Sequence, residues 1–459
     1  MPPAEDTLLA DQMRLLLTAP AFPQENFIRG RITYQALFDL AYGLKGALDA
    51  YKDPDQPVCL FTEESALTAA ALLVAAAEGT PQMLLPYALT PNVLREIHAT
   101  TGACRVITDR PDALPAPMHA VTFAPAGFPD GGLPPAGPDK TMLHLFTGGT
   151  TGNPRVVPKT VGNLFGEAFF MAQRFAVTRQ DCFVAAAVPY HIYGLLFAVL
   201  VPLVASARLA PGASPFPHDI RDALARYNAT IFAGVPMHYR VLRNVALSAG
   251  SLRLALSSAG RLDPEDGADF FRRTGVGVTE IYGSTETGGV ATRNRGKGET
   301  GFTALDSVAI KIEGERLYVR SPYLSPDLGT DADGFFRTGD RVREKAGGGF
   351  ILLGRADGIV KVGGKRVDLE GVQACLRDLP GITDALVLAL PAGRARENEV
   401  VALVEGKIDI VDLRQALSGK VEPYALPRRI LNVDKIPISA AGKYDRQAAA
   451  ALFAAAEGI

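Results

Sequence analysis

The sequence predicts an α/β protein: a large N-terminal domain of mostly parallel sheets flanked by helices, and a small α+β domain at the C-terminal end. Three observations predict this class. The chain has 459 residues, more than one hydrophobic core usually holds. Its first third alternates short apolar runs with Ala/Leu-rich helical runs, the pattern of βαβ units. Its last part mixes strand-like segments with amphipathic helices, so we expect domains over residues 1–354 and 355–459.

The first elements are expected in the order strand, helix, strand, helix, strand. They fall at residues 58–61, 64–77, 83–86, 91–100 and 104–108. Residues 142–146 suit a further strand that leads into a Gly/Thr-rich turn, and residues 161–175 suit the helix after it. The turn is therefore expected at the carboxyl end of a strand.

Residues 183–207 carry no charged side chain and are long enough to span a bilayer. Pro189 and Pro202 break this run, so a buried strand and a buried helix are expected, and no transmembrane segment. Further on, residues 309–320 and 350–353 alternate in polarity, which predicts antiparallel strands at the end of the large domain.

The composition is that of a soluble globular protein, with 47% hydrophobic and 21% charged residues. A formal net charge of −2 gives no electrostatic basis for binding nucleic acid. The four cysteines are far apart and show neither a CxxC pair nor a zinc-binding spacing with histidine. With no signal-peptide pattern at the N-terminus, a reduced, cytoplasmic location is predicted.

The strongest local signal is the Gly/Thr loop at residues 146–155. Its glycines let backbone N–H groups turn toward one point and its threonines add hydroxyl donors, which together suit phosphate oxygens. The Gly-Lys-Ser/Thr ending of a Walker A loop is missing. An ordinary Gly-rich turn is the alternative. The candidate phosphate-binding residues are Thr147, Gly148, Gly149, Thr150, Thr151, Gly152 and Arg155.

A second candidate segment, residues 281–287, joins an aromatic ring, hydroxyl groups and a carboxylate. A nucleotide site needs this mixture: a ring over the purine, hydroxyls for phosphate, and a carboxylate for Mg²⁺. By itself the segment could equally be a capped helix start. Its candidate binding residues are Tyr282, Gly283, Ser284, Thr285 and Glu286.

Further polar turns follow in the last third. Residues 336–340 place Asp340 behind a predicted tight turn, as a ribose diol would require. Arg355 and Gly364 lie in two short Gly-containing segments, and Lys443 lies on a glycine turn near the C-terminus. Each of these could also be a surface turn with solvated charges.

Taken together and in this order, the segments resemble the adenylate-forming superfamily of acyl-CoA synthetases, peptide-synthetase adenylation domains and luciferases. The resemblance covers residues 58–446, and it is strongest to short bacterial acyl or aryl ligases, on the basis of residues 158–160 and 189–197. It implies a small barrel-like β part in the large domain and a mobile C-terminal domain. It also implies activation of a small carboxylic acid with ATP and Mg²⁺, release of pyrophosphate, and transfer of the acyl group to a thiol.

The resemblance implies a role for each matching residue. The loop from Thr147 to Arg155 would close over the β- and γ-phosphates. Tyr282 would pack on adenine, Thr285 would contact the α-phosphate, and Glu286 would hold Mg²⁺. The remaining residues match family positions for the ribose (Asp340, Arg355), the hinge (Asp357), the pantetheine tunnel (Gly364), and the bridge between the substrate carboxylate and the α-phosphate (Lys443).

This chain departs from the family pattern at three places. Gly148 and Gly149 stand where Ser-Gly is usual, and Arg155 replaces a lysine while keeping its charge. Residues 321–326 replace the usual Gly-Tyr segment before the predicted Thr-Gly-Asp turn.

The acyl site is expected around His191, because the family often places an aromatic ring or a histidine there to close over the acid. The alternative is a structural histidine at the edge of the core, whose ring nitrogens have hydrogen-bond partners there. Residues 232–237 and 257–260 match the walls of the acyl site, and their small side chains suggest an aryl or medium-length acid.

Three functions stay open at this point. The leading one is a ligase that makes an acyl thioester, with coenzyme A as the first candidate for the thiol and the phosphopantetheine of an acyl-carrier protein as the alternative. The second is a catalytically weakened nucleotide-binding regulator, and the presence of both Glu286 and Lys443 disfavours it. The third is an unrelated phosphate-binding module that shares only the Gly/Thr loop.

Overall fold

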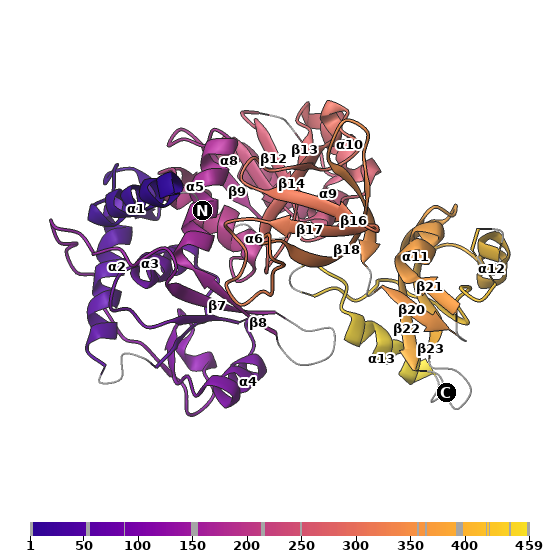
Figure 1. Ribbon diagram of the computed structural model, residues 1–459, viewed down its shortest axis with the longest axis horizontal. Coiled ribbons are helices and arrows are strands. Elements are labelled where there is room, and N and C mark those ends of the chain that lie inside the picture. Colours follow the sequence, from indigo (N-terminus) through magenta and orange to yellow (C-terminus); the bar gives the residue numbers. More distant parts are fainter. Residues whose placement is uncertain are drawn as a thin grey trace. The chain divides into compact units, whose positions relative to one another are not determined.

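The computed structural model describes most of the chain (Figure 1). The described residues are 3–51, 56–86, 88–147, 155–212, 216–247, 250–355, 358–362, 365–391, 398–418, 420–421, 423–439 and 442–456. Contacts divide the chain into two compact units. The first comprises Met1–Ala309 and Val319–Phe336, and the second comprises Ile310–Tyr318 and Arg337–Ile459. The predicted boundary between residues 354 and 355 stays a prediction.

The N-terminal part of the first unit is a six-stranded sheet in the order β6-β5-β3-β4-β7-β8. Its strands pair in parallel except for β7 and β8, which are antiparallel. The strands are β3 (Val58–Leu60), β4 (Met83–Leu85), β5 (Arg105–Ile107), β6 (His119–Ala120), β7 (Thr141–Thr147) and β8 (Arg155–Thr160). The associated helices are α2 (Tyr34–Asp49), α3 (Ser65–Ala75) and α4 (Pro91–Thr101), and a 3₁₀ turn spans Pro111–Ala113.

Local sequence signals explain the helix boundaries in this part. The Thr90 side chain accepts a hydrogen bond from Val93 N, Pro91 occupies the first turn, and Gly102 ends α4 in the left-handed conformation. Helix α3 is apolar on nearly all sides and is buried from Thr68 onward, which is why residues 64–77 show no polar face.

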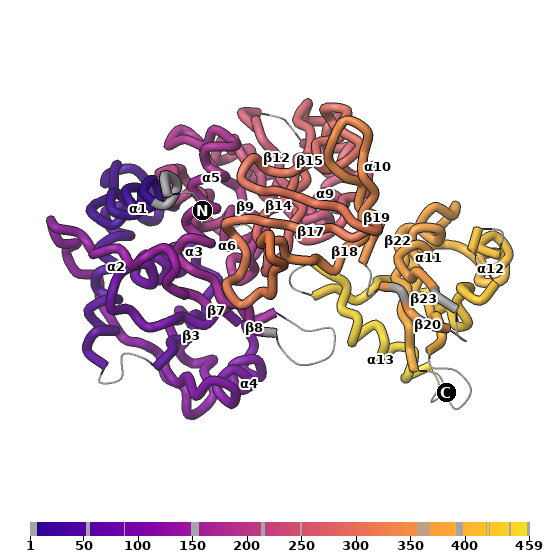
Figure 2. Tube along the Cα trace, viewed as in Figure 1, coloured from indigo at the N-terminus to yellow at the C-terminus, as the bar shows by residue number. Residues whose placement is uncertain are grey.

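The second sheet of this unit has nine strands in the order β15-β14-β13-β12-β11-β9-β10-β1-β2, which are coloured from indigo through magenta to orange in Figure 2. Strands β1, β10, β9, β11, β12 and β13 are parallel neighbours, and β2, β14 and β15 add antiparallel pairs at the two edges. The strands are β1 (Asn26–Ile28), β2 (Ile32–Thr33), β9 (Cys182–Ala185), β10 (Arg208–Leu209), β11 (Ile231–Gly234), β12 (Leu254–Ser257), β13 (Val278–Ser284), β14 (Gly288–Asn294) and β15 (Thr303–Ala304). The helices of this part are α1 (Pro3–Thr18), α5 (Glu167–Arg174), α8 (Pro217–Arg226), α9 (Pro236–Leu242) and α10 (Pro264–Thr274), with a π-helical turn at Gly162–Gly166 and a 3₁₀ turn at Arg295–Lys297.

The long uncharged run folds as the predicted buried strand, β9, and a buried helical segment. That segment consists of α6 (Ile192–Leu195), a π-helical turn (Leu196–Leu200) and α7 (Val201–Val204). The prediction that Pro202 breaks the run is wrong, because Pro202 lies in the first turn of α7. The π-helical turn before it changes the hydrogen-bond pattern, so the missing N–H of this proline does not end the helical segment.

The second unit contains a four-stranded sheet in the order β16-β17-β18-β19, a two-stranded hairpin and a three-stranded sheet. Two apolar clusters cover the three-stranded sheet: one includes residues of α11 and α12, and the other includes Ala449 and Phe453 of α13. The strands are β16 (Ala309–Glu313), β17 (Arg316–Arg320), β18 (Phe336–Glu344), β19 (Phe350–Arg355), β20 (Ile359–Val362), β21 (Lys365–Asp368), β22 (Ile382–Pro391), β23 (Asn398–Gly406) and β24 (Arg429–Asn432). The helices are α11 (Leu369–Arg377), α12 (Ile410–Ser418) and α13 (Arg446–Ala456).

The α/β class predicted from the sequence is confirmed. All four cysteines are free thiols, in line with their scattered positions. Of the helices in the described part of the chain, none combines the length and the apolar character needed to cross a bilayer.

Candidate active site

Four predicted site segments follow the carboxyl ends of neighbouring parallel strands in the first unit. His191 follows β9, residues 232–237 include the end of β11, residues 257–260 begin at the end of β12, and Tyr282 lies in the last part of β13. Because these strands are parallel neighbours, their carboxyl ends lie along one edge of the sheet. In open α/β sheets this edge is where ligands bind.

The segment that carries Tyr282 and Glu286 is the turn of a β-hairpin between β13 and β14. The alternative of a capped helix start is therefore wrong. Ser284 and Thr287 close the turn: Ser284 N donates to Thr287 Oγ1 at 3.0 Å, and Thr287 N donates to Ser284 Oγ at 3.2 Å. Gly283 is required because a Cβ there would lie 2.2 Å from the carbonyl oxygen of Gly288. Thr285 and Glu286 are half-buried at the tip.

A buried lysine ties this turn to the strand that follows the Gly/Thr loop. Lys159, in β8, is 1% exposed, and its Nζ donates to the carbonyl oxygens of Tyr323 at 2.9 Å and Glu286 at 3.4 Å. Ser325 adds two bonds, from its N to Glu286 O at 2.8 Å and from its Oγ to Pro158 O at 2.7 Å. The segment 321–326, which differs from the pattern of the superfamily that the sequence resembles, thus joins β8 to the Glu286 turn.

A buried carboxylate contacts the second strand of the same hairpin. Glu167, at the start of α5, is 2% exposed, and its Oε1 accepts a hydrogen bond of 2.6 Å from Gly289 N. A Cβ on Gly288 would lie 2.7 Å from Glu167 Oε2, so the glycine makes room for the carboxylate. Burial lowers the pKa of Lys159 to about 8 and raises that of Glu167, and the attraction between the two charges opposes both shifts.

Replacing Lys159 with methionine is expected to lower the free energy of unfolding by about 3 kcal/mol or more. The carbonyl oxygens of Tyr323 and Glu286 would lose their donor, and buried Glu167 would lose a nearby positive charge. Denaturant unfolding measures the difference. The matched control Lys297→Met, at an exposed position of the same unit, should change the free energy by less than about 0.5 kcal/mol. Equal effects of the two variants would contradict the assigned role of Lys159.

His191 lies directly before helix α6, with extended backbone dihedrals. Its ring is half-buried, and the ring centroid is 4.9 Å from that of buried Tyr190. Gly194 lets the chain fold back here, since a Cβ on it would lie 1.9 Å from Val188 O. The structure therefore places His191 beside the strand ends, where its role as a lid over the acid stays a prediction.

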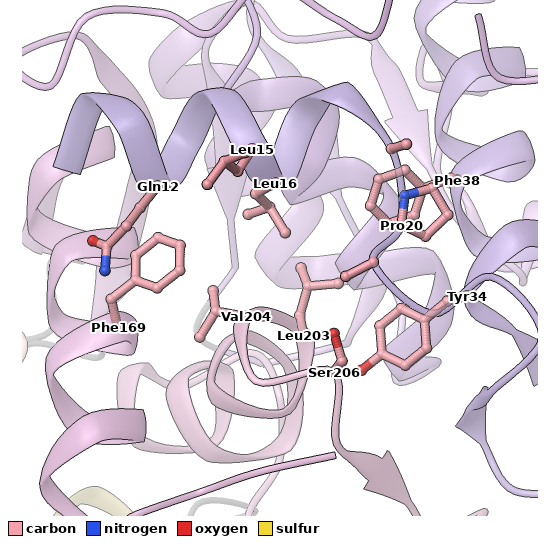
Figure 3. Close-up of a pocket in the computed structure, with 12 residues that line it drawn as sticks. Gln12, Leu15, Leu16, Pro20, Tyr34, Phe38, Phe169, Leu203, Val204 and Ser206 are labelled. Carbon is pink, nitrogen blue, oxygen red and sulfur yellow. The ribbon is translucent and has the colours of Figure 1, made fainter. Parts of the chain in front are cut away.

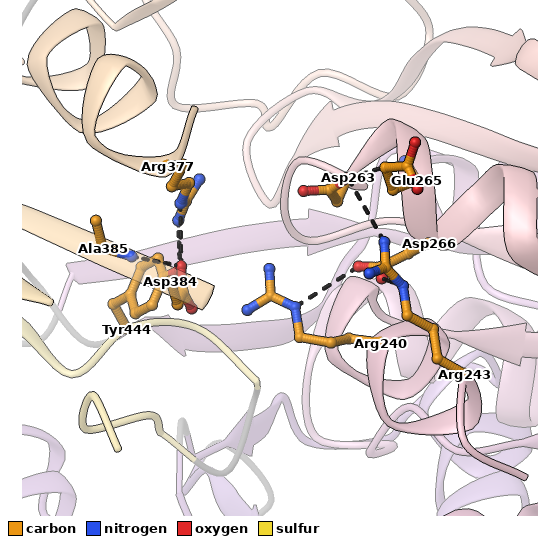
Figure 4. A network of polar contacts seen from close by, with 9 residues as sticks. All are labelled: Arg240, Arg243, Asp263, Glu265, Asp266, Arg377, Asp384, Ala385 and Tyr444. Carbon is orange, nitrogen blue, oxygen red and sulfur yellow. Dashed lines mark hydrogen bonds and ion pairs between the residues drawn. The ribbon is translucent and has the colours of Figure 1, made fainter. Parts of the chain in front are cut away.

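The predicted wall segments lie at the ends of β11 and β12. Ala259 has a φ of 67°, a left-handed conformation that costs a non-glycine residue energy and is found preferentially at functional sites. Helix α9 begins directly after β11, and Arg243 on it contacts buried Asp266 of α10, with Nε 2.5 Å from Oδ1 (Figure 4). This contact joins the carboxyl end of α9 to α10.

His238, the third residue of α9, is buried, and its Nδ1 accepts a hydrogen bond of 3.1 Å from Val235 N. Burial lowers its pKa from 6.5 to about 4. Below pH 6.5 the unfolded chain binds a proton that the folded chain does not. His238 therefore lowers the free energy of unfolding as the pH falls from 6.5 to 4, by up to about 3 kcal/mol.

His238→Gln, which does not titrate in this range, is expected to lose this part of the acid sensitivity. Denaturant unfolding between pH 4 and 7 should show the stability difference between wild type and variant shifting in favour of the variant as the pH falls. The control His119→Gln, at an exposed histidine, should run parallel to wild type. A parallel profile for His238→Gln would contradict the neutral, buried state of this imidazole.

In the second unit, Asp340 and Arg355 face each other on paired strands β18 and β19, with Arg355 Nη1 4.0 Å from Asp340 Oδ1. The prediction of a tight turn before Asp340 is wrong, because residues 336–344 form one strand. Gly339 lies under the guanidinium of Arg355, and a Cβ on it would lie 2.7 Å from Arg355 Nη2. The Thr338 hydroxyl donates to Leu317 O at 3.0 Å and fixes the strand from the other side.

Lys443 lies on the predicted glycine turn of the second unit. Gly442 has a φ of 71°, its N donates to Ser439 O, and Ser439 N donates to Lys443 O at 2.7 Å. The Lys443 side chain is exposed. The structure does not place the two units relative to each other, so the approach of Lys443 to Glu286 stays a prediction.

Some predicted residues lie outside the described residues: Gly148, Gly149, Thr150, Thr151, Gly152, Asp357 and Gly364. Thr147 ends β7 and pairs with Arg155 at the start of β8, which confirms that the loop follows the carboxyl end of a strand. A separate pocket, lined by residues of α1, α2, α5 and α7, contains none of the predicted site residues (Figure 3).

Comparison with known proteins identifies the family. A model of the AMP-binding enzyme family matches residues 18–326. The chain belongs to this family. The family recognised in the sequence is therefore confirmed, and with it the expected class of enzyme.

Similar proteins and structures agree with this membership. The sulfoacetate–CoA ligase of Cupriavidus necator is 28% identical over 376 residues, covering 74% of this chain and 72% of that protein. The salicyl-AMP ligase / salicyl-S-ArCP synthetase of Mycobacterium tuberculosis is 25% identical over 352 residues, covering 69% of this chain and 62% of that protein. The crystal structure of ATP-bound MatB from Rhodopseudomonas palustris superimposes with a TM-score of 0.83 at 22% identity, over 97% of this chain and 99% of that one, which shows a shared fold.

The sequence did not reveal Lys159 and Glu167 as parts of this site. One signal for Lys159 was available: it is a lone charge in an otherwise uncharged run from residue 156 to residue 166. Its partners are 127 and 164 residues away, beyond the reach of any local pattern.

Proposed function

We propose that this chain activates a carboxylic acid with ATP, releases pyrophosphate, and transfers the acyl group from the resulting acyl-adenylate to the thiol of coenzyme A. The observation that carries the proposal is the convergence at one sheet edge of the Tyr282–Glu286 turn with His191 and the small-residue wall at residues 257–260. The similarity to a sulfoacetate–CoA ligase supports coenzyme A as the acceptor.

Each site residue has a part in the proposal. The loop from Thr147 to Arg155 binds the β- and γ-phosphates. Tyr282 covers the adenine, Thr285 contacts the α-phosphate, and Gly283 and Ser284 shape the turn between them. Asp340 accepts hydrogen bonds from the ribose hydroxyls, and Arg355 beside it holds this carboxylate in place.

The residues at the turn fit a magnesium ion bound together with the nucleotide. Glu286 and Thr285 offer hard oxygen atoms, and no three His, Cys, Asp or Glu side chains gather into a metal site within the described parts of the chain. Mg²⁺ commonly takes one or two carboxylates together with substrate phosphates and water. Glu286 would hold the ion, whose charge would offset that of the triphosphate.

The chemistry requires charge neutralisation more than a base. A carboxylate is a weak nucleophile that approaches an already anionic α-phosphate, so the site must lower the repulsion and hold the attack in line. We assign this role to the ammonium group of Lys443. The acid oxygen bonds to the α-phosphorus, the bond to pyrophosphate breaks, and a mixed anhydride with AMP remains.

In the second step the thiolate attacks the acyl carbon and AMP leaves. This step needs an open path for the thiol and no longer needs Lys443. We infer that the small domain reorients about Asp357 between the steps, and that Gly364 then borders the pantetheine path.

Two buried hydroxyl groups narrow the range of acids that we propose as substrates. Ser257 Oγ, at the carboxyl end of β12, and Tyr193 Oη, in α6 two residues after His191, have no hydrogen-bond partner in the described structure. Buried hydroxyls usually find a partner. We therefore favour an aryl or medium-length acid that carries a polar substituent.

An acyl-carrier protein is the second candidate acceptor, because the similar protein from Mycobacterium tuberculosis is a salicyl-S-ArCP synthetase. Acid-dependent ATP–pyrophosphate exchange with benzoate, salicylate, sulfoacetate and octanoate tests the first step. Product analysis with coenzyme A or with a phosphopantetheinylated carrier protein then tests the second. If none of these four acids supported exchange, the proposal would be contradicted. Thioester on the carrier alone would replace coenzyme A by the second candidate. A cytoplasmic location stays a prediction.

A further inference from the structure

The backbone of the turn that carries Lys443 is closed by short-range bonds. Ile438 and Tyr444 form an isolated antiparallel bridge, and Asp445 N donates to Pro437 O at 2.9 Å. On the far side, Asp445 Oδ1 accepts hydrogen bonds from Gln447 N and Ala448 N at the start of α13. The Cα of Lys443 is thus held between a bridge and a capped helix, but these bonds alone do not attach the turn to the rest of the unit.

Ile436 before the turn and α13 after it pack on the three-stranded sheet, and the contact closest to Lys443 along the chain comes from the next residue. The Tyr444 hydroxyl contacts both carboxylate oxygens of Asp384 in β22, at 2.7 Å to Oδ1 and 2.8 Å to Oδ2 (Figure 4). Arg377 of α11 completes the cluster: its Nε donates to Asp384 Oδ1 at 3.0 Å, and its Nη2 donates to the Tyr444 hydroxyl.

Burial and charge make this cluster strong. Asp384 is 5% exposed and its Oδ1 also accepts from Ala385 N at 2.8 Å. Hydrogen bonds to an ionised carboxylate are roughly twice as strong as neutral ones, and a low local dielectric strengthens them further. The phenol donates to the carboxylate and accepts from the guanidinium, so a single hydroxyl joins the turn to both β22 and α11.

We propose that Tyr444, held by Asp384 and Arg377, is a positioning residue for Lys443. The inference rests on the proposed role of Lys443 in acyl-adenylate formation. A lysine side chain is long and flexible, so its ammonium reaches one point reliably only when its backbone is fixed. A misplacement of about 1 Å can cost a reaction a factor of about 100. The cluster fixes the turn at the residue next to Lys443.

If Tyr444 had a purely structural role, its ring would matter and its hydroxyl would not. Its ring packs against the apolar cluster that includes Leu386, Leu388 and Ile436. Tyr444→Phe keeps this ring and removes only the hydroxyl, so packing and positioning are separated. Asp384→Asn weakens the same bonds from the other side and keeps the ring unchanged.

The two half-reactions provide the test, with the acid of the panel that gives the fastest exchange in wild type. Tyr444→Phe is expected to lower ATP–pyrophosphate exchange by about tenfold or more. Transfer of the acyl group from pre-made adenylate to coenzyme A should stay within about twofold, because that step does not use Lys443. Asp384→Asn should act in the same direction. The control Tyr318→Phe, on β17 of the same unit, should leave both steps unchanged.

A double variant tests whether the Tyr444 hydroxyl acts through Lys443. In the Lys443→Ala background, Tyr444→Phe should cause no further loss of exchange, because the hydroxyl acts through the lysine. If Lys443→Ala loses exchange but Tyr444→Phe exchanges normally, the positioning role of Tyr444 is overturned and the proposed role of Lys443 stands. Equal losses in both half-reactions of Tyr444→Phe would have the same meaning. Normal exchange in Lys443→Ala would overturn the proposed role of Lys443 and, with it, the inference.

Discussion

Lys443→Ala is expected to lower the rate of acid-dependent ATP–pyrophosphate exchange by roughly 100- to 1,000-fold, the usual loss when one preorganised group is removed from a developing negative charge. The substrate carboxylate and the α-phosphate of ATP are both negative and repel each other. The ammonium group of Lys443 is the positive charge that we assign to offset this repulsion. Transfer from pre-made adenylate to coenzyme A should remain largely intact, because the reacting carbonyl carries no such charge.

The matched control is Lys435→Ala, an exposed lysine of the same unit. It should leave exchange within about twofold of wild type, since isolated surface changes rarely matter. A Lys443→Ala enzyme that lost both half-reactions equally would refute the assignment of this lysine to the first step alone.

Glu286→Gln is expected to raise the Mg²⁺ concentration needed for half-maximal exchange and to lower the maximal rate by roughly 100-fold. The amide keeps the size of the side chain but loses the negative charge that Mg²⁺ requires. A titration of exchange with MgCl₂ at fixed ATP measures both effects.

The hairpin itself should stay folded in this variant. Hydrogen bonds from Lys159 and Ser325 to the Glu286 carbonyl oxygen, and those between Ser284 and Thr287, hold the turn, and the Glu286 side chain takes part in none of these bonds. Glu265→Gln, an exposed glutamate at the start of α10, is the control. An unchanged magnesium dependence in Glu286→Gln would remove Glu286 from the metal site.

Much of the fold could be predicted because the responsible signals are local. Short apolar runs gave strands β3, β4 and β5, and Pro91 with Gly102 marked the ends of α4. The site followed from the same pattern: motifs placed directly after parallel strands must gather at one sheet edge. The order of the motifs then identified the family.

The errors arose where distant contacts decide the local conformation. Thr-Gly-Asp at residues 338–340 has the composition of a turn, but pairing with β19 extends it as a strand. A proline such as Pro202 usually breaks a helix, but the π-helical turn before it accommodates the missing N–H.

The supporting residues of the site were beyond sequence reasoning for a similar reason. Lys159 meets its partners only when β8 and the Glu286 turn fold together. Tyr444 meets Asp384 and Arg377 across 60 and 67 residues of sequence. Spacing cannot indicate such contacts, because each side chain by itself fits a solvated surface equally well.

The most direct test of the central claim is the identity of the nucleotide product in the absence of a thiol. The protein is incubated with ATP, MgCl₂ and the acid that supports exchange, and the bound and released products are identified by mass spectrometry. The account predicts pyrophosphate together with an acyl-adenylate retained on the protein. Formation of ADP and phosphate, with no acyl-adenylate, would contradict it.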